Sequence, residues 1–517
     1  MYTVEFPPGV NIEITWFTCV NRGILGPRTL FNLRKMADYD SDYERVLDII
    51  DASSGSEFSG FISEETDISS DDDSVSEDWE NAPENDGTDD RTPRCVLPAG
   101  PKLPRDFDVK SAGALDYFTL FVPMDVYDHI ACETNLYAEL VQREKGEMDD
   151  RWTDISGPEI RAFIGLNILM GASPRHSYED YWRDNDFLGS PGFKNTMTYN
   201  RYEKLSQYIH VNTAAARERR SDPNYHPINK VKPLYDVTNQ NFRRYYQHST
   251  EISIDEAMKG YKGRSELRQY MPDKPEKFKI KFWARCDGRT SYMSMYQLFT
   301  GKRDRTPIQL QHGLGYRVVH DLTRDLGGLN HHVTLATDLL LEDIYTCGTL
   351  NPNRKEIPPQ LQQKKAIIKL QIPQRGDSVD YKKDGLSVTA WNDNNVVPVL
   401  HNNSSSDPVR YERQVGRNRQ MIPQPKAIAD YNRFMNGVDL HDQMRKKYSC
   451  GRASKKYWKY LMWFIIDCAR TNAYIIFRED SPKEAVHSVT SLRNLVNLSL
   501  ETSVDERDCV SEKFYLP

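Results

Sequence analysis

The sequence lacks the features of a secreted or membrane-spanning protein. None of its apolar runs approaches the roughly 20 residues that a membrane helix needs, and the best of them spans only 461–466. The N-terminus has no basic start followed by a long apolar block, which argues against a secretory signal. The eight cysteines include no closely spaced pair. Their scatter argues against a disulfide framework and a CxxC zinc site, and it favours a reducing compartment.

Charge is distributed very unevenly along the chain. The net charge of the 517 residues is −7, yet 37–90 alone holds 20 acidic residues against one basic residue, Arg45. The rest of the chain therefore carries +12. We predict that the region 36–109 is disordered, because it cannot bury enough apolar surface to offset its ordering entropy. An acidic N-terminal region, here called the acidic head, joined to a basic remainder of the chain is typical of a protein whose basic part binds a polyanion. An acidic head that is only solvated and aids solubility is an equally good explanation for this region.

Apolar residues recur at helical spacing between 110 and 250. One helix is predicted to begin after Ser156 as N-cap, with Glu159 three residues later completing a capping box. Further helices are expected at 200–210 and 231–246. This part of the chain is predicted to be an all-α domain.

Beyond residue 250 the hydrophobic period changes to two. A short strand at 252–255 ends in acid, and 278–286 and 292–299 flank the turn Asp287-Gly288 as a β-hairpin. Other elements are expected in chain order: helices at 304–314 and 318–326, a strand at 330–335, strands at 386–391 and 396–400 within an inserted set of β-hairpins, and helices at 425–448 and 455–477. Strands that alternate with helices indicate a mixed α/β sheet.

Three acids are the candidates for chemistry. Asp255 ends the first strand, and Asp439 and Asp442 lie three residues apart, hence on one face of a helix that is otherwise largely apolar. A single aspartate is usually just solvated, but two acids on such a face are costly unless cations compensate them. Carboxylates that hold two divalent cations are the requirement for phosphodiester cleavage and strand transfer, and a third carboxylate normally completes such a site.

Three basic segments accompany these acids, and aromatic residues are interspersed among them. Basic side chains neutralise phosphates and aromatic rings stack on bases, so the pattern favours nucleic acid over a merely solvated basic face. The candidate DNA-binding residues are Lys274, Lys277, Lys279, Arg417, Arg419, Arg445, Lys446, Lys447, Arg452, Lys455 and Lys456.

At these residues the sequence resembles the piggyBac transposase family. The resemblance runs from about 116 to 478 and rests on several stretches that together are highly specific: Ser253-Ile254-Asp255-Glu256-Ala257-Met258, Lys262-Gly263-Arg264, Tyr270-Met271-Pro272, Cys347-Gly348-Thr349 with Asn353-Arg354-Lys355, and Met435-Asn436-Gly437-Val438-Asp439 with Asp442-Gln443. It implies an α/β fold with an RNase H-like catalytic core, split by a β-rich insertion and flanked by all-α dimerisation and DNA-binding elements. It also implies cut-and-paste transposition through DNA hairpins at TTAA targets, a homodimer, and a place in the nucleus.

The resemblance assigns roles and boundaries along the chain. Asp255 looks like the family's first metal-binding aspartate and Asp439 like the last, with Asp442 as its companion, and two Mg²⁺ ions would be their cofactors. The expected domains are an unassigned extension at 1–35, the acidic region at 36–109, a helical dimerisation and DNA-binding domain at 110–250, the core at 251–350 and 425–450, the insertion at 351–424, a second helical part at 451–480 and a tail at 481–517.

The sequence departs from the family's pattern in two places. The segment that should carry the middle aspartate is missing between Val333 and Thr334. Strand alternation would put Asp338 at a strand end as a substitute ligand, whereas the resemblance puts it inside a following helix at 335–342. The family's cysteine-rich zinc module is also absent, since only Cys509 follows Cys468, so no zinc is expected.

Three functions fit these observations. The first is a transposon-derived protein that binds DNA but has lost or impaired transposition. The second is an active metal-dependent transposase that uses Asp255, Asp338 and Asp439. The third is a non-catalytic chromatin or protein-interaction module, in which the acidic head recruits chromatin partners.

Overall fold

The structure of the protein is a computed structural model. It describes residues 80–81, 97–185, 189–216, 218–219, 221–272, 276–301, 307–326, 331–335, 345–350, 357–362, 365–383, 385–402, 408–415, 418–451 and 454–480. The expected extension at 1–35, most of the acidic head and the tail at 481–517 lie outside the described residues. The region predicted to be disordered, 36–109, was drawn too long, because its C-terminal end is ordered. There β2 (Gly100–Pro101) pairs with β3 (Tyr246–Gln247), and the ring of Phe107 packs on that of Tyr117.

The region 110–250 is helical, as predicted. Its elements are α3 (Ala114–Phe121), α4 (Met124–Lys145), α5 (Gly157–Ala172), η2 (Glu179–Trp182), α6 (Pro191–Thr196), α7 (Tyr199–Tyr208), η3 (Ala214–Ala216), η4 (Asn229–Val231) and α8 (Lys232–Arg244). The capping residues set where α5 begins: Ser156 is its N-cap, and the Ser156 backbone N–H donates to the Glu159 carboxylate.

A mixed sheet follows these helices. Its central strands are β4 (Glu251–Gly260), β6 (Phe278–Asp287), β7 (Met293–Leu298), β8 (His332–Leu335) and β9 (Tyr345–Thr349), with β5 (Arg268–Tyr270) on the edge of β6. The order β7-β6-β4-β8-β9 joins two antiparallel pairs to two parallel ones, because β8 runs parallel to both β4 and β9. The hairpin of β6 and β7 was predicted, whereas β4 is more than twice as long as expected.

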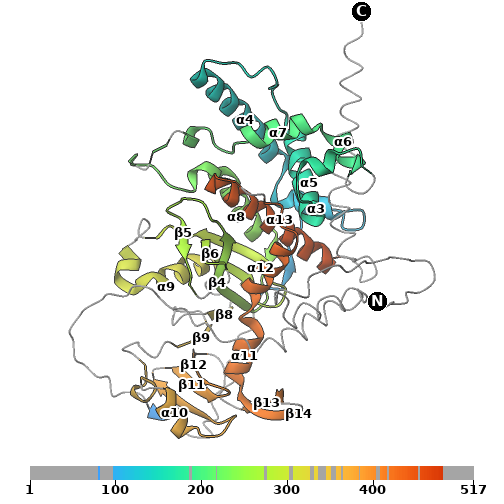
Figure 1. The fold of residues 1–517 in the computed structure, drawn as a ribbon. Helices are drawn as coiled ribbons and strands as arrows, with labels where there is room; N and C mark the ends of the chain where they lie inside the picture. The colour runs from blue at the N-terminus through green and yellow to red at the C-terminus, as the bar shows by residue number, and fades with distance from the viewer. Residues whose placement is uncertain are drawn as a thin grey trace, which may run out of the picture. The chain divides into compact units, whose positions relative to one another are not determined.

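The inserted segment extends the same sheet. Its elements are η6 (Pro359–Leu361), α10 (Lys365–Gln371), β10 (Ser378–Lys383), β11 (Leu386–Asn392), β12 (Val396–His401), β13 (Pro408–Val415) and β14 (Asn418–Pro425). Strand β12 pairs with β9, and β11, β10 and β1 (Glu80–Asn81) continue outward, while β13 and β14 form a separate hairpin (Figure 1). The sequence predicted β11 and β12 but gave no sign that they would pair with the central strands.

The two faces of β4 meet different helices. Ile252 and Ile254 point to the face where, with Trp283, they pack against α9 (Pro307–Thr323). The predicted pair of helices is present within α9, where two helices meet at a kink at Gly313, whose φ is 87°. Because side chains alternate along a strand, Asp255 lies on the opposite face. Its partner there on β6 is Ala284.

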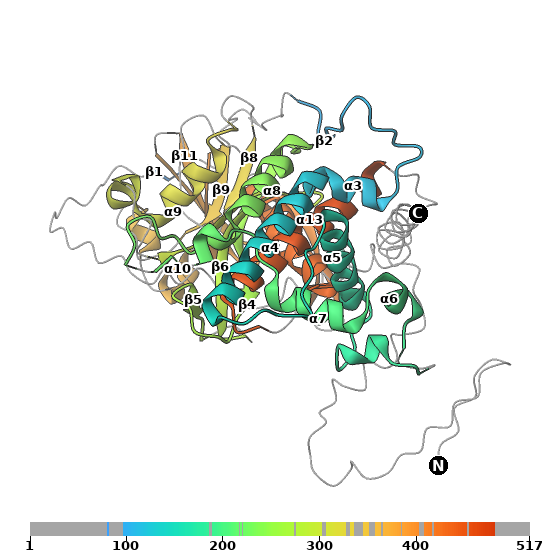
Figure 2. The same cartoon turned by 90° about the horizontal axis from the view of Figure 1, so that it is seen from above.

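Three C-terminal helices complete the fold: α11 (Lys426–Phe434), α12 (Gly437–Lys447) and α13 (Tyr457–Asp480). The expected helix at 425–448 is thus broken at Met435–Asn436. Helix α13 is buried over most of its length, and its Phe464 ring stacks on Phe282 of β6 with centroids 3.9 Å apart. Figure 2 shows α13 among α3, α4, α5 and α8. In the part of the chain that is described, no helix is long and apolar enough to span a membrane.

Candidate functional site

Helix α12 begins against the face of β4 that carries Asp255. The Ser253 hydroxyl donates to the backbone oxygen of Met435 at 2.8 Å. Gly437, the first residue of α12, comes so close that a Cβ added there would lie 2.8 Å from the Cβ of Ser253. The missing side chain therefore allows the helix to pack directly on the strand.

A second anchor lies two turns further along α12. The backbone N–H of Met258 donates to Asp442 Oδ2 at 3.2 Å, and Arg445 Nη2 donates to the Met258 oxygen at 2.8 Å. Helix and strand therefore run in the same direction between the two anchors. Asp439 lies on α12 between them, and Asp255 lies on β4 between Ser253 and Met258.

One buried tyrosine lies near both aspartates. Tyr431, on α11, is 4% exposed. Burial raises the pKa of its hydroxyl, and the negative charges of Asp255 and Asp439 raise it further, against a hydrogen bond from Thr349 that lowers it. The structure thus places two acids, separated by more than 180 residues of sequence, on packed elements and near one tyrosine. Asp255 is half-buried and Asp439 is exposed.

Asp442 has a different environment from Asp439. It is 5% exposed, Arg445 contacts its Oδ1 at 2.7 Å, and Lys446 lies 3.3 Å from its Oδ2. Burial opposes ionisation of this carboxyl, but the charges of Arg445 and Lys446 outweigh burial and hold its pKa below the usual range. Both carboxylate oxygens are engaged within the protein, which fits a residue that positions α12.

The acids do not form a complete set of metal ligands in the described part of the chain. No group of three His, Cys, Asp or Glu side chains there could hold a metal ion. Asp255 and Asp439 supply carboxylates of the kind that Mg²⁺ prefers, but a two-ion site would need more. The neighbouring acid Glu256 points to the other face of β4 and pairs with Lys281.

Strand β8 lies where a third acid would be expected. It is the parallel neighbour of β4, and its last residue, Leu335, pairs with Ile254, directly before Asp255. The four residues of β8 and the five of β9 include no carboxylate. Asp338 lies outside the described residues, so the choice between a strand end and a helix for it stays open.

The candidate basic residues divide by exposure. Lys274, Arg417 and Arg452 lie outside the described residues. Six others are exposed: Lys277, Arg419, Lys446, Lys447, Lys455 and Lys456. The remaining two are not available at the surface. Lys279 is 9% exposed, and Arg445 is fully buried with its guanidinium over the ring of Phe464. Arg445 therefore packs within the core and does not face a ligand.

Lys277 belongs to a surface that the sequence only partly indicated. The exposed rings of Tyr270 and Phe278 lie next to each other with centroids 5.3 Å apart. The guanidinium of Arg268 lies over the Phe278 ring at 4.5 Å. The alternation of Lys and Phe in β6 predicted the basic and aromatic character of this strand. Arg268 and Tyr270 come from β5, whose pairing was not predicted.

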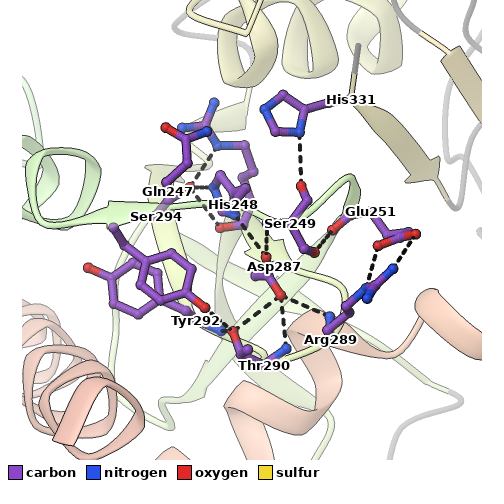
Figure 3. A network of polar contacts seen from close by, with 12 residues as sticks. Gln247, His248, Ser249, Glu251, Asp287, Arg289, Thr290, Tyr292, Ser294 and His331 are labelled. Carbon is purple, nitrogen blue, oxygen red and sulfur yellow. Dashed lines mark hydrogen bonds and ion pairs between the residues drawn. The ribbon is translucent and has the colours of Figure 1, made fainter. Parts of the chain in front are cut away.

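The sequence also missed a buried polar network at the start of β4 (Figure 3). Asp287, read from sequence as a turn residue, is fully buried and accepts backbone N–H groups from Ser249, Arg289 and Thr290 at 2.6 to 2.9 Å. His248 lies beside it, with Nδ1 3.7 Å from the carboxylate. These bonds close the β6–β7 turn against β4 and so fix the strand that carries Asp255.

Comparisons with known proteins find a matching family, similar proteins and a similar fold. The model of a family described as Transposase IS4 matches residues 113–474. PiggyBac transposable element-derived protein 5 of Homo sapiens is 25% identical over 391 residues, which cover 71% of this chain and 71% of that protein. PiggyBac transposable element-derived protein 3 of Homo sapiens is 27% identical over 391 residues, covering 72% of this chain and 62% of that protein. The cryo-EM structure of a piggyBac transposase synaptic complex with hairpin DNA matches with a TM-score of 0.66 at 22% identity, over 80% of this chain and 84% of that one.

Proposed function

We propose that this chain, which belongs to the piggyBac family of transposases, is a transposon-derived DNA-binding protein whose strand cleavage and transfer are impaired. The observation that carries the proposal is the packing of α12, which carries Asp439, on the strand that carries Asp255, beside strands that supply no third carboxylate among the described residues. Within the described residues, the two acids would hold the position of a catalytic centre without a full set of ligands.

The strand order supports an RNase H-like core at 251–350 and 425–450. Three antiparallel strands, β7, β6 and β4, are followed by two that run parallel to β4, and α9 connects the two groups. Asp255 in β4 and Asp439 in α12 are far apart in sequence and lie on two elements that pack against each other. We take the segment 351–424 as the insertion that splits this core, and 110–250 and 451–480 as the helical parts that bind DNA and form a homodimer.

The bound metal ions, when present in such a site, activate the attacking oxygen and stabilise the leaving one. In this chain Asp255 and Asp439 would be their ligands, and Asp442 would hold α12 in place through Arg445 and Met258.

DNA binding is supported by the exposed cations on several elements. Lys446 and Lys447 end α12, Lys455 and Lys456 precede α13, and Lys277 adjoins the Tyr270–Phe278 rings. Cations of this kind bind the phosphate backbone without regard to sequence, and they release counterions when they do so. The protein would accordingly act on DNA in the nucleus.

Two assays on the full-length chain test the proposal. First, the affinity for duplex DNA is measured as a function of salt. A logarithmic affinity that falls steeply with salt supports binding through phosphates, whereas an affinity that is absent or insensitive to salt would favour a protein-interaction module. Second, excision of a donor element flanked by TTAA is measured with Mg²⁺. We expect no clean excision. Excision that disappears in both Asp255→Ala and Asp338→Ala would instead identify an active transposase that uses Asp338.

A further inference from the structure

Three lysines converge at the N-terminus of α13, where the helix itself carries partial positive charge. Lys456 immediately precedes α13 and Lys459 lies in its first turn, while Lys230 lies in η4, which packs against α13. Cations are unfavourable at this end of a helix, since the macrodipole and the unpaired N–H groups there attract anions. The 24-residue helix α13 nevertheless begins among lysines. This placement goes against the usual preference for anions at a helix N-terminus and brings no evident gain in stability.

No described carboxylate forms an ion pair with these lysines. Lys459 donates to the backbone oxygen of Ser206, and Lys230 donates to that of Ala216 at 3.3 Å. Burial and the charge of Lys456 lower the pKa of Lys459 to about 8. Burial and Lys456 also lower the pKa of Lys230, against the weaker attraction of Glu218. The free protein therefore holds these cations against their mutual repulsion.

A buried imidazole ring whose nitrogens form no hydrogen bonds among the described residues lies among the lysines. His210 is 2% exposed, and neither of its ring nitrogens has a partner among the described residues. Its ring stacks on Tyr137 with centroids 4.1 Å apart and meets Trp458 edge to face at 4.8 Å. Burial first, and then the charges of all three lysines, lower its pKa to about 3. An unsatisfied buried polar group of this kind costs free energy and calls for a partner.

The aromatic rings hold the cations at this place. Lys456 Nζ lies 5.5 Å from the centroid of Tyr137 and 6.0 Å from that of Trp458, and Lys459 Nζ lies 5.7 Å from Trp458. Cation–π contacts stabilise an ammonium group without neutralising it. The positive charge thus stays available to an anion.

We propose that Lys230, Lys456, Lys459 and His210 form a binding site for a phosphate group of DNA at the N-terminus of α13. The inference rests on the DNA binding proposed above and adds Lys230, Lys459 and His210 to the residues that the sequence indicated. A phosphate fits because it matches both the lysines and the helix N-terminus. It would relieve the repulsion among the lysines and give a ring nitrogen of His210 an acceptor.

The decisive variant is Lys456→Gln, because Lys456 is exposed and its replacement should not disturb the core. We expect two opposite effects. The melting temperature of the free protein rises, since one repelling cation is gone, while the affinity for DNA falls about 3- to 10-fold and the salt slope decreases by about 1. A purely structural lysine would lower the melting temperature instead. The matched control is Lys145→Gln, which replaces an exposed lysine in the last turn of α4. Its melting temperature and its affinity for DNA should each change by no more than about one third of the change seen in Lys456→Gln.

A second variant tests the histidine separately. His210→Phe keeps an aromatic ring between Tyr137 and Trp458 but removes both ring nitrogens. The free protein should be at least as stable as the wild type, because an unsatisfied polar group is removed. Its affinity for DNA should fall, because the phosphate loses a hydrogen-bond donor.

The outcomes separate this inference from the proposed function. If the chain binds DNA and both Lys456→Gln and His210→Phe bind it as tightly as Lys145→Gln, the phosphate site is wrong while DNA binding stands. If the chain binds no DNA, the proposed function fails, and inorganic phosphate decides the remaining question. A melting temperature that phosphate raises in the wild type and not in Lys456→Gln supports a site for free phosphate, and equal responses overturn the site altogether.

Discussion

Asp442 accepts the backbone N–H of Met258 at 3.2 Å, and this hydrogen bond fixes the helix that carries Asp439 against the strand that carries Asp255. The same carboxylate neutralises Arg445, which is fully buried. The two acids three residues apart on α12 thus do different things. Asp439 faces outward toward the candidate site, and Asp442 faces inward and joins helix to strand.

The first prediction follows from this difference. Asp442→Ala leaves the Arg445 charge buried without its partner, so the free energy of unfolding should fall by about 3 to 5 kcal/mol. Asp439→Asn changes an exposed residue and should stay within about 0.5 kcal/mol. Urea denaturation of both variants in EDTA measures the difference. Equal stabilities would contradict the assignment of Asp442 as the residue that positions α12.

The second prediction concerns the approach of α12 to β4. In Gly437→Ala the new methyl group would lie 2.8 Å from Ser253 Cβ and 3.0 Å from the Asp287 oxygen, so the helix must shift. We expect a loss of about 1 to 3 kcal/mol in the free energy of unfolding, as in other overpacked cores. Gly192→Ala, in α6, meets nothing within 4 Å and serves as the control. It should be neutral or slightly stabilising, because alanine favours a helix. If both variants are equally stable, the close contact does not exist in solution.

Local motifs were predictable from sequence, and tertiary ones were not. The start of α5 could be predicted because Ser156 and Glu159 cap it within four residues. The break between α11 and α12 could not. It depends on Ser253, which binds the Met435 oxygen from 182 residues away. In the same way, β12 pairs with β9 through backbone atoms that carry no sequence signal.

The candidate site shows the same division. The carboxylate side chains of Asp255 and Asp439 indicated metal-binding acids. Only the packing of α12 on β4, however, shows that their elements lie side by side. Arg445 was taken for a DNA-binding residue because it lies in a basic run. Its spacing of three from Asp442 was the available signal that it is an internal partner instead. His210 gave no signal, because its environment consists of residues from α4, η4 and α13.

The third prediction is a loss of stability in mild acid. Burial lowers the pKa of His248 to about 4, against the favourable effect of Asp287, and the charges of Arg285 and His331 act in the same direction as burial. The unfolded chain, with an ordinary pKa near 6.5, therefore takes up the proton first as the pH falls. The contribution of His248 to the free energy of unfolding is fully present above about pH 6.5, and it is lost as the pH falls from there to about 4. Between pH 7 and pH 5 this residue alone accounts for about 2 kcal/mol.

The measurement is the difference in the free energy of unfolding between pH 7 and pH 5. In His248→Gln this difference should shrink by about 2 kcal/mol, whatever the variant's stability at pH 7. His176→Gln, at an exposed position, should leave the difference as it is in the wild type. An unchanged difference in His248→Gln would mean that the histidine is not kept neutral by burial.

The last prediction concerns divalent ions. A ligand that binds only the folded state raises the melting temperature, and the rise grows with the logarithm of the ligand concentration over its Kd. The described residues offer Mg²⁺ only Asp255 and Asp439 beside strands without a third carboxylate. We therefore expect millimolar Mg²⁺ or Mn²⁺ to shift the melting temperature of the wild type no more than that of Asp255→Ala. A rise of several degrees that disappears in Asp255→Ala, Asp439→Ala and Asp338→Ala alike would show that the site is complete. In that case Asp338 replaces the missing aspartate, and the impairment proposed for this chain is wrong.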